Sequence, residues 1–118
     1  LFEPGSATLA EAGKVEIGNI ADILRSIAED IPSGIDWVIR VDGHTDNIPV
    51  GVNARFEDNW ELSQARALSV VRFMSEDLGI DPRRLAANGF GEFQPLNPLD
   101  SPEARAQNRR IELKLTER

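Results

Sequence analysis

The spacing of apolar residues changes repeatedly along this 118-residue chain, and this change of period most constrains its fold. From Glu11, apolar side chains recur at steps of three and four, which predicts an amphipathic helix that ends at the breakers of residues 32–34. Residues 35–42 then alternate between apolar and polar, which predicts a strand with one buried face. Helical and strand periods in succession indicate an α+β fold.

The remaining elements continue this alternation. A long helix is predicted to follow Asp58 or Asn59, either of which can cap it, and to stop at Gly79. Residues 85–93 indicate a strand interrupted by glycines, residues 103–107 a short helical turn and residues 109–116 a closing strand. With a short, broken strand at residues 1–9, the order is β-α-β-α-β-(short α)-β. This order predicts a single domain over residues 1–118, with a mixed four-stranded sheet and helices packed on one face.

Charge and cysteine content exclude several classes of function. The chain has 20 Asp+Glu against 13 Lys+Arg, a net charge of −7, which opposes nucleic-acid binding because that binding depends on clustered cations. It has no cysteine, so a disulfide scaffold, a cysteine nucleophile and a Cys-ligated metal are excluded. No apolar run reaches the roughly 20 residues that span a bilayer. The chain begins at Leu1 rather than Met, so we expect a piece of a longer protein with any membrane anchor upstream.

Polar side chains gather where the predicted strands end and the predicted helices begin. They are Asp46 after the second strand, Asn59 and Arg66 near the start of the long helix, and Arg109 and Arg110 at the start of the last strand. If these ends meet at one rim of the sheet, the rim offers a carboxylate, guanidinium groups and the free N–H groups of a helix start. That set fits a small zwitterion such as an amino-acid head group.

Simpler structural interpretations exist for the same side chains. Asp46 could form an Asx turn with the backbone that follows it, and Asn59 could act only as a helix cap. Arg66 could pair with Glu57 or Glu61 on a solvated face. Its position among apolar residues of the helix favours a buried, paired role instead.

Arg109 and Arg110 alternate across a strand, so only one of them can point to the pocket rim. Arg109 has the parity of Ile111, which predicts the helix-covered side of the sheet. A buried arginine requires a partner, and Asp42 or Asp46 could serve. Arg110 is then expected to be solvated. Trp60 is expected to pack near the start of the long helix rather than to form a binding platform.

A metal-dependent hydrolase is an alternative of a different class. Asp42, His44 and Asp46 are spaced two residues apart and would share one face of a continuing strand, where they could ligate a divalent metal. Gly43 opposes a continuous strand, and the single histidine leaves no second imidazole for a usual zinc set. We therefore expect His44 to be structural, hydrogen-bonded to backbone at the turn, and we expect no metal or other cofactor.

Four motifs follow one another along the chain and cover nearly all of it. They are Gly43-His44-Thr45-Asp46, Asn59-Trp60-Glu61-Leu62-Ser63 with Arg66-Ala67, Gly89-Phe90-Gly91-Glu92 with Pro95, and Asn108-Arg109-Arg110-Ile111-Glu112. In this order they resemble the OmpA-like peptidoglycan-binding domain. The stretch Asn47-Ile48-Pro49-Val50 with Phe56, and the start Leu1-Phe2-Glu3-Pro4-Gly5-Ser6-Ala7, resemble the MotB-type subgroup of flagellar stator proteins. Pal lipoproteins and outer-membrane porins usually have a shorter loop after the first motif.

The resemblance implies a non-catalytic domain that binds the diaminopimelate of the peptidoglycan stem peptide. Asp46 would bind the ligand's ammonium group and Arg66 its carboxylate. Asn59 and either Arg109 or Arg110 would support these contacts, and Thr45 and Leu62 lie within the same motifs. The resemblance further implies a periplasmic location, a homodimer, a parent protein anchored in the inner membrane, and a stator partner subunit. A Pal-type or porin-type wall anchor is the alternative within the family.

Overall fold

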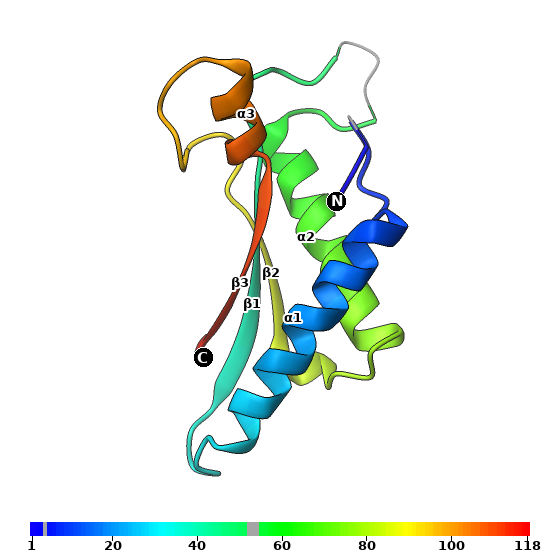
Figure 1. Cartoon of the computed structure of the whole chain (residues 1–118), viewed down its shortest axis with the longest axis vertical. Helices are drawn as coiled ribbons and strands as arrows, with labels where there is room; N and C mark the ends of the chain where they lie inside the picture. The colour runs from blue at the N-terminus through cyan, green and yellow to red at the C-terminus, as the bar shows by residue number, and fades with distance from the viewer. Residues whose placement is uncertain (4, 52–54) are drawn as a thin grey trace.

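The computed structural model describes residues 1–3, 5–51 and 55–118. Within these residues the helices and strands follow one another along a single elongated body (Figure 1). Their order is α1 (Glu11–Glu29), β1 (Trp37–His44), α2 (Asn59–Glu76), the 3₁₀ turn η1 (Pro82–Arg84), β2 (Leu85–Gly89), α3 (Pro102–Asn108) and β3 (Arg110–Glu117). No helix in the described part of the chain is both long and apolar enough to cross a membrane.

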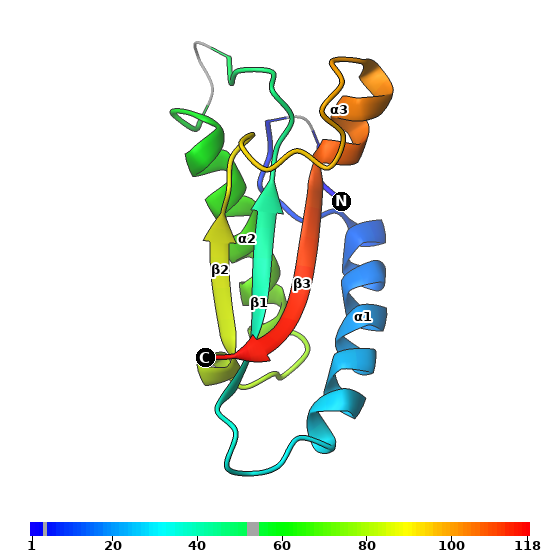
Figure 2. The same ribbon diagram turned by 90° about the vertical axis from the view of Figure 1, so that its left-hand side faces the viewer.

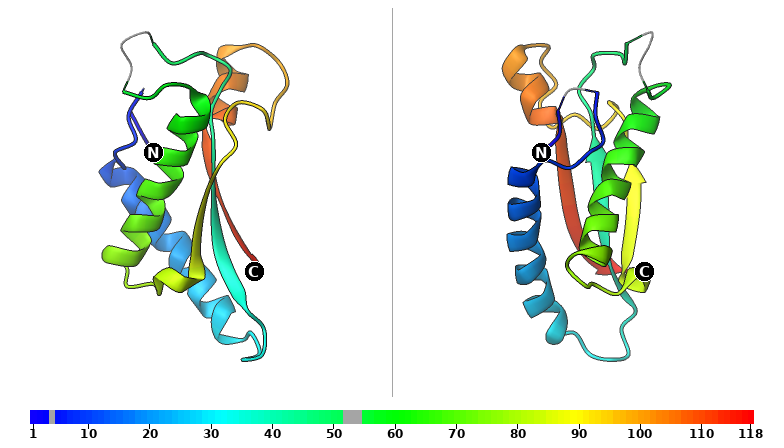
Figure 3. Two further views of the ribbon diagram at one scale, coloured as in Figure 1. Left: turned by 180° about the vertical axis from the view of Figure 1, so that it is seen from behind. Right: turned by 90° about the vertical axis from the view of Figure 1, so that its right-hand side faces the viewer.

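The sheet has the strand order β2-β1-β3, with β1 parallel to β2 and antiparallel to β3 (Figure 2). In the centre, Val41 is paired with Ala87 on one side and with Leu113 on the other. Helices α1 and α2 lie on one face of this sheet, and the other face carries no helix among the described residues (Figure 3). The predicted α+β class, the mixed sheet and the one-sided helices are therefore confirmed.

The prediction of a fourth strand is wrong for the residues that the structure describes. Instead of a strand in the sheet, residues 1–9 contribute one isolated bridge, between Phe2 and Leu9. The backbone turns back on itself, since the Ser6 N–H donates to the Glu3 carbonyl and Gly5 has a φ of +69°. Side chains of α2 then bond to the carbonyls of Glu3, Ser6 and Ala7, so these groups are not available to a strand partner.

The core lies between the helices and the helix-facing side chains of the sheet. It is apolar throughout and contains Leu9, Ile17, Ala21, Ile39, Val41, Ala67, Val70, Met74 and Ile80. The expectation that only one face of β1 is buried is wrong at Asp42, which lies on the other face and is 0% exposed. Arg40 and Lys114 form ion pairs with the Asp42 carboxylate, and the Asn88 amide donates to it. A charge buried in this way is tolerated because its oxygens are paired.

A helix cap fixes where α2 begins, and two glycines of the neighbouring strands allow α2 to pack close to the sheet. The Asp58 carboxylate accepts a hydrogen bond from the Glu61 N–H at 2.9 Å, so Asp58, and not Asn59, is the N-cap. Gly43 and Gly89 are paired across β1 and β2. A Cβ at Gly43 would overlap the Ser63 carbonyl, and one at Gly89 would lie 2.5 Å from the Gln64 nitrogen. The absence of these two side chains lets α2 approach the strand ends that carry the site.

We expect Gly43→Ala to lower the free energy of unfolding by about 3 kcal/mol, because the added methyl group meets backbone that cannot rotate away. Urea denaturation with an unchanged m value measures this loss. The matched control is Gly18→Ala in α1, where no atom lies within 4 Å of the added Cβ. That change is expected to be neutral or stabilising by up to about 1 kcal/mol. Equal tolerance of both substitutions would show that α2 does not require the close approach.

Candidate ligand-binding site

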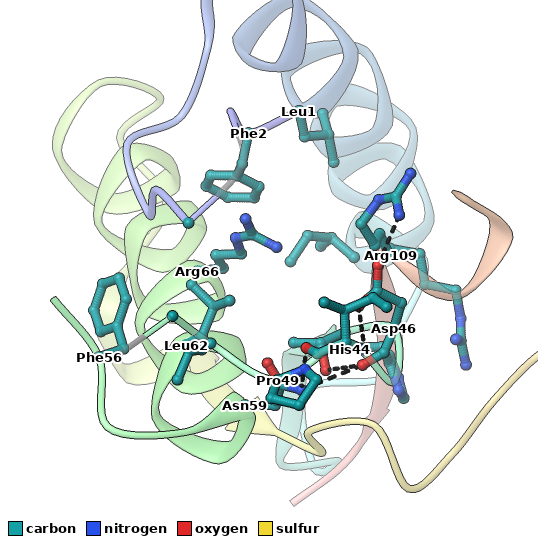
Figure 4. Close-up of a pocket in the computed structure, with 17 residues that line it drawn as sticks. Leu1, Phe2, His44, Asp46, Pro49, Phe56, Asn59, Leu62, Arg66 and Arg109 are labelled. Carbon is teal, nitrogen blue, oxygen red and sulfur yellow. Dashed lines mark hydrogen bonds and ion pairs between the residues drawn. The ribbon is translucent and has the colours of Figure 1, made fainter. Parts of the chain in front are cut away.

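A cavity of about 640 Å³ opens where the end of β1 meets the start of α2, the α3–β3 junction and the N-terminal residues (Figure 4). All seven site residues expected from the sequence line it, namely Thr45, Asp46, Asn59, Leu62, Arg66, Arg109 and Arg110. In Figure 4, Arg66 comes from α2 on one side of the cavity, and Asp46 and Arg109 come from the other side. The expected convergence of strand ends and helix start at one rim is therefore present.

Asp46 lies just past the end of β1 and uses both carboxylate oxygens. Oδ1 accepts from the Ile48 N–H at 3.0 Å, which is the Asx turn, and Oδ2 accepts from Arg109 Nη1 at 2.7 Å. The Thr45 N–H donates to the Gly91 carbonyl at 2.9 Å, and the Thr45 hydroxyl donates to the Asp46 carbonyl at 2.9 Å. Asp46 is thus held at the rim by its own turn, by Thr45 and by a cation.

Arg66 lies on α2 and is only 7% exposed. Its Nε donates to the Ser6 carbonyl at 2.8 Å, and its Nη2 donates to the Glu3 carbonyl at 3.2 Å. The expected alternative partners, Glu57 and Glu61, form no ion pair with it in the structure as described. Burial lowers the pKa of the Arg66 guanidinium, while the Asp46 charge opposes that shift. An arginine remains protonated under such conditions, so Arg66 places a positive charge beside neutral oxygens.

Asn59 ties the loop after β1 to the start of α2. Its side-chain amide donates to the Asp46 carbonyl at 3.3 Å and to the Ile48 carbonyl at 3.1 Å. The same nitrogen lies 3.5 Å from Glu92 Oε1. Asn59 is therefore a positioning residue for the Asp46 loop, and its alternative role as a helix cap is taken by Asp58.

The two consecutive arginines point to different partners, as their alternation predicts. Arg109 pairs with Asp46 in the cavity, so it has one of the two acidic partners that were expected. Both arginines line the cavity, however, because Arg109 caps the end of α3 and β3 begins only at Arg110, so the expectation that only one of them reaches the pocket is wrong. Arg110 donates to Glu112 and, through Nη2, to the Gln94 carbonyl at 3.1 Å. Its side chain is 17% exposed, so the expectation of a solvated Arg110 is wrong. The guanidinium group that faces Asp46 is that of Arg109.

The neighbouring motif residues have structural roles. The Asn108 side chain accepts from the N–H groups of Leu96 and Asn97 and donates to the Asn97 carbonyl, which fixes the loop before α3. Trp60 is 52% exposed and packs against Phe93 in a tilted arrangement, with ring centroids 4.9 Å apart and an angle of 31° between the ring planes. Trp60 thus packs near the start of α2 with one face of its ring against Phe93, while about half of the residue is exposed to solvent.

His44 is buried without the expected hydrogen bond to backbone. Neither ring nitrogen has a partner among the described residues, and the ring stacks on Phe90 at 5.1 Å. Its Nε2 lies 4.0 Å from Glu112 Oε2. Burial and the Arg110 charge lower the pKa of His44, against the opposing effects of Glu112 and Asp42.

The arrangement does not support the metal alternative. Asp42 is paired on the open face of the sheet, while Asp46 is paired with Arg109 in the cavity. Among the residues with described positions, no group of three His, Cys, Asp or Glu side chains could hold a metal ion.

The lowered pKa of His44 predicts a pH-dependent stability. The unfolded chain takes up a proton below about pH 6.5, whereas the folded state resists protonation until lower pH. The contribution of His44 to the free energy of unfolding is therefore fully present above that pH. It is lost as the pH falls from 7.5 toward 5.5, with a slope of at most about 1.4 kcal/mol per pH unit. His44 is the single histidine, so His44→Gln should flatten this slope in denaturation curves measured across the window. An identical slope in the variant would assign the effect to another group.

Sequence reasoning missed the apolar walls of the cavity. Besides the seven expected residues, the lining includes Leu1, Phe2, Ile48, Pro49, Val50, Phe56 and Ile111. Ile48, Pro49, Val50 and Phe56 stand in the stretch that marks the MotB-type subgroup, which was a signal for this wall. Among the described residues that line the cavity, three are arginines, Arg66, Arg109 and Arg110, and one, Asp46, is acidic, although the protein has a net charge of −7. The cavity therefore favours a ligand with at least one carboxylate.

The fold is that of a small α+β domain with a charged cavity at one end, and comparison with known proteins assigns its family. The OmpA family matches residues 1–109. This match covers most of the 118 residues, and the chain belongs to the OmpA family.

Its relatives include proteins of the MotB type, as the sequence resemblance predicted. Motility protein B of Bacillus subtilis is 31% identical over 112 residues, which is 95% of this chain and 40% of that protein. A MotB-like protein from Desulfovibrio vulgaris superposes with a TM-score of 0.84 at 37% identity, over 100% of this chain and 68% of the other. The periplasmic domain of Helicobacter pylori MotB superposes with a TM-score of 0.81 at 30% identity, over 99% of this chain and 76% of the other. The chain thus spans about two fifths of the Bacillus protein.

Proposed function

We propose that this domain binds peptidoglycan without cleaving it, by holding the diaminopimelate of the stem peptide in the cavity between Asp46 and Arg66. The observation that carries the proposal is the placement of one carboxylate and one buried guanidinium in the same cavity. Among the described residues, the Arg66 guanidinium donates hydrogen bonds to two neutral carbonyls and forms no ion pair, so its charge is available to an anion. Membership of the OmpA family supports the same ligand class.

The proposal gives each charged group a role. The ligand's ammonium group binds Asp46, where it competes with or joins the 2.7 Å contact from Arg109. The ligand's carboxylate binds Arg66. Arg109 is 48% exposed in its side chain, so it can turn toward the same carboxylate when the ammonium group arrives. Thr45 and Asn59 hold the Asp46 loop, and Leu62 forms part of the apolar wall.

The proposal extends to the protein of which this chain forms part. The MotB-type relatives support a wall anchor for a membrane protein in the cell envelope, with the domain in the periplasm and the parent in the inner membrane. On this proposal the parent is a stator subunit that works with a partner subunit and forms a homodimer. A Pal-type or porin-type anchor would use the same cavity and is distinguished by the type of membrane attachment in the full-length protein.

Sedimentation with purified insoluble peptidoglycan tests the function. We expect the domain to pellet with the peptidoglycan, to be released by a soluble stem peptide that contains diaminopimelate, and to leave the glycan and peptide bonds intact. A chelator should not change binding. A domain that stays in the supernatant would refute wall binding. Chelator-sensitive release of soluble fragments would instead support the metal-dependent hydrolase.

A further inference from the structure

We infer that the N-terminal segment, here residues 1–3 and 5–6, is a working part of the binding site because it fixes which edge of Arg66 faces the ligand. This inference rests on the proposed function. The segment lies between the starts of the two long helices, with the N-terminus beside the first turns of α1 (Figures 2 and 3). In Figure 4, Phe2 lies beside the Arg66 guanidinium at the border of the cavity.

The segment holds Arg66 through three contacts. Nε donates to the Ser6 carbonyl at 2.8 Å and Nη2 donates to the Glu3 carbonyl at 3.2 Å. The central carbon of the guanidinium lies 5.2 Å from the centre of the Phe2 ring, within the range of a cation–π contact. These contacts bridge about sixty positions of sequence, so the segment can act on Arg66 only in the folded domain.

The two hydrogen bonds to the segment occupy one edge of the Arg66 guanidinium and leave a second edge free to bind a ligand. A guanidinium carries five N–H donors in a fixed planar fork. The edge that contains Nε and one proton of Nη2 is bound to the two carbonyls. The remaining pair of parallel donors is at the far end, on Nη1 and Nη2. A ligand carboxylate therefore binds end-on, to Nη1 and Nη2, while Nε stays bonded to Ser6.

The segment is itself anchored, so it can hold Arg66 rather than follow it. The Ser69 hydroxyl donates to the Ala7 carbonyl, and the Ala10 N–H donates to the Leu1 carbonyl at 2.9 Å. Gly13 of α1 lies so close to Leu1 that an added Cβ would meet the Leu1 backbone at 3.2 Å. An arginine held in this way has already lost its rotamer freedom before the ligand binds, which favours affinity. Its fixed donors also favour a carboxylate over a carboxamide, because a carboxamide offers one acceptor oxygen where the carboxylate offers two.

The test measures carboxylate selectivity in variants of Phe2. Affinity is measured by calorimetry for a stem peptide with a free diaminopimelate carboxylate and for the same peptide with that group amidated. The substitution Phe2→Leu keeps apolar bulk but removes the ring face. We expect it to lower affinity for the free carboxylate about threefold to fivefold, with a smaller loss for the amide, so that the selectivity ratio falls. Phe2→Tyr keeps the ring and should restore the ratio. Phe93→Leu is the matched control, because Phe93 lies outside the cavity lining and is 58% exposed.

The Nε–H signal of Arg66 in NMR spectra gives a second, independent measurement. Bonded to Ser6, this proton should exchange slowly and should keep its chemical shift when the free-carboxylate peptide binds. A wild-type domain that binds the peptide, with a large Nε–H shift or an unchanged selectivity ratio in Phe2→Leu, would overturn the inference and leave the proposed function standing. A wild-type domain that binds neither peptide would overturn both.

Discussion

Arg66→Gln is expected to reduce affinity for a diaminopimelate-containing stem peptide by at least about 100-fold, or about 2.7 kcal/mol. The physical reason is that Arg66 places a buried positive charge in the cavity, and its described hydrogen-bond partners are neutral carbonyls. Removing the charge removes a charge-assisted pair with the ligand carboxylate in a site largely shielded from water. Glutamine retains a donor for one of the two carbonyls, so the change acts on binding more than on folding.

Calorimetry with soluble stem peptide measures this loss, and thermal denaturation checks that the variant is folded. Arg66→Lys keeps the charge without the planar fork and should lose about tenfold, between wild type and Arg66→Gln. Arg72→Gln is the matched control, since Arg72 is an exposed arginine of the same helix outside the cavity lining. A folded Arg66→Gln domain with wild-type affinity would place the ligand carboxylate elsewhere.

Asp46→Asn is expected to weaken binding by about 10-fold to 100-fold through loss of the ammonium contact. The substitution preserves shape, and the amide oxygen can still accept from the Ile48 N–H. The effect can be assigned to the ammonium group by a double-mutant cycle in which the ligand's amine is acetylated. Acetylation should weaken binding to wild type strongly and binding to Asp46→Asn little.

The double-mutant cycle has a matched control on α1 and an outcome that would contradict the ammonium contact. Asp22→Asn also removes one negative charge, but at an exposed position of α1. It should leave the affinities for the free-amine peptide and for the acetylated peptide unchanged. Equal and additive losses from Asp46→Asn and from acetylation would show that the ammonium group does not contact Asp46. In that case the role of Asp46 would be limited to its pair with Arg109.

Local pattern was sufficient to predict the features of the site that depend on neighbours in sequence. The position of Asp46 and Arg109 at element ends predicted that they would meet, and the structure shows Arg109 in the cavity beside Asp46. The capping pattern at Asp58 and the stop at Gly79, which has a φ of +71°, were also readable. These features follow from period, cap chemistry and the left-handed conformation that glycine accepts.

Features that depend on distant pairing were not predictable in the same way. The carbonyls that hold Arg66 belong to residues about sixty positions away, and backbone acceptors have no signature in a side-chain pattern. The same limit explains why the prediction of a fourth strand was wrong. The N-terminal residues have a strand-like composition, but the carbonyls of Ser6 and Ala7 accept hydrogen bonds from side chains of α2 instead of from a strand partner. His44 was expected to bond to backbone, but Phe90, which follows β2 and donates its N–H to the Gly43 carbonyl, stacks on the imidazole instead.

A crystal structure of the domain with a bound stem peptide tests the central claim most directly. The account predicts the diaminopimelate ammonium group within hydrogen-bond distance of the Asp46 carboxylate, and the carboxylate of the same stereocentre on Nη1 and Nη2 of Arg66. A ligand bound outside this cavity, or bound inside it with neither charged group on Asp46 and Arg66, would contradict the account.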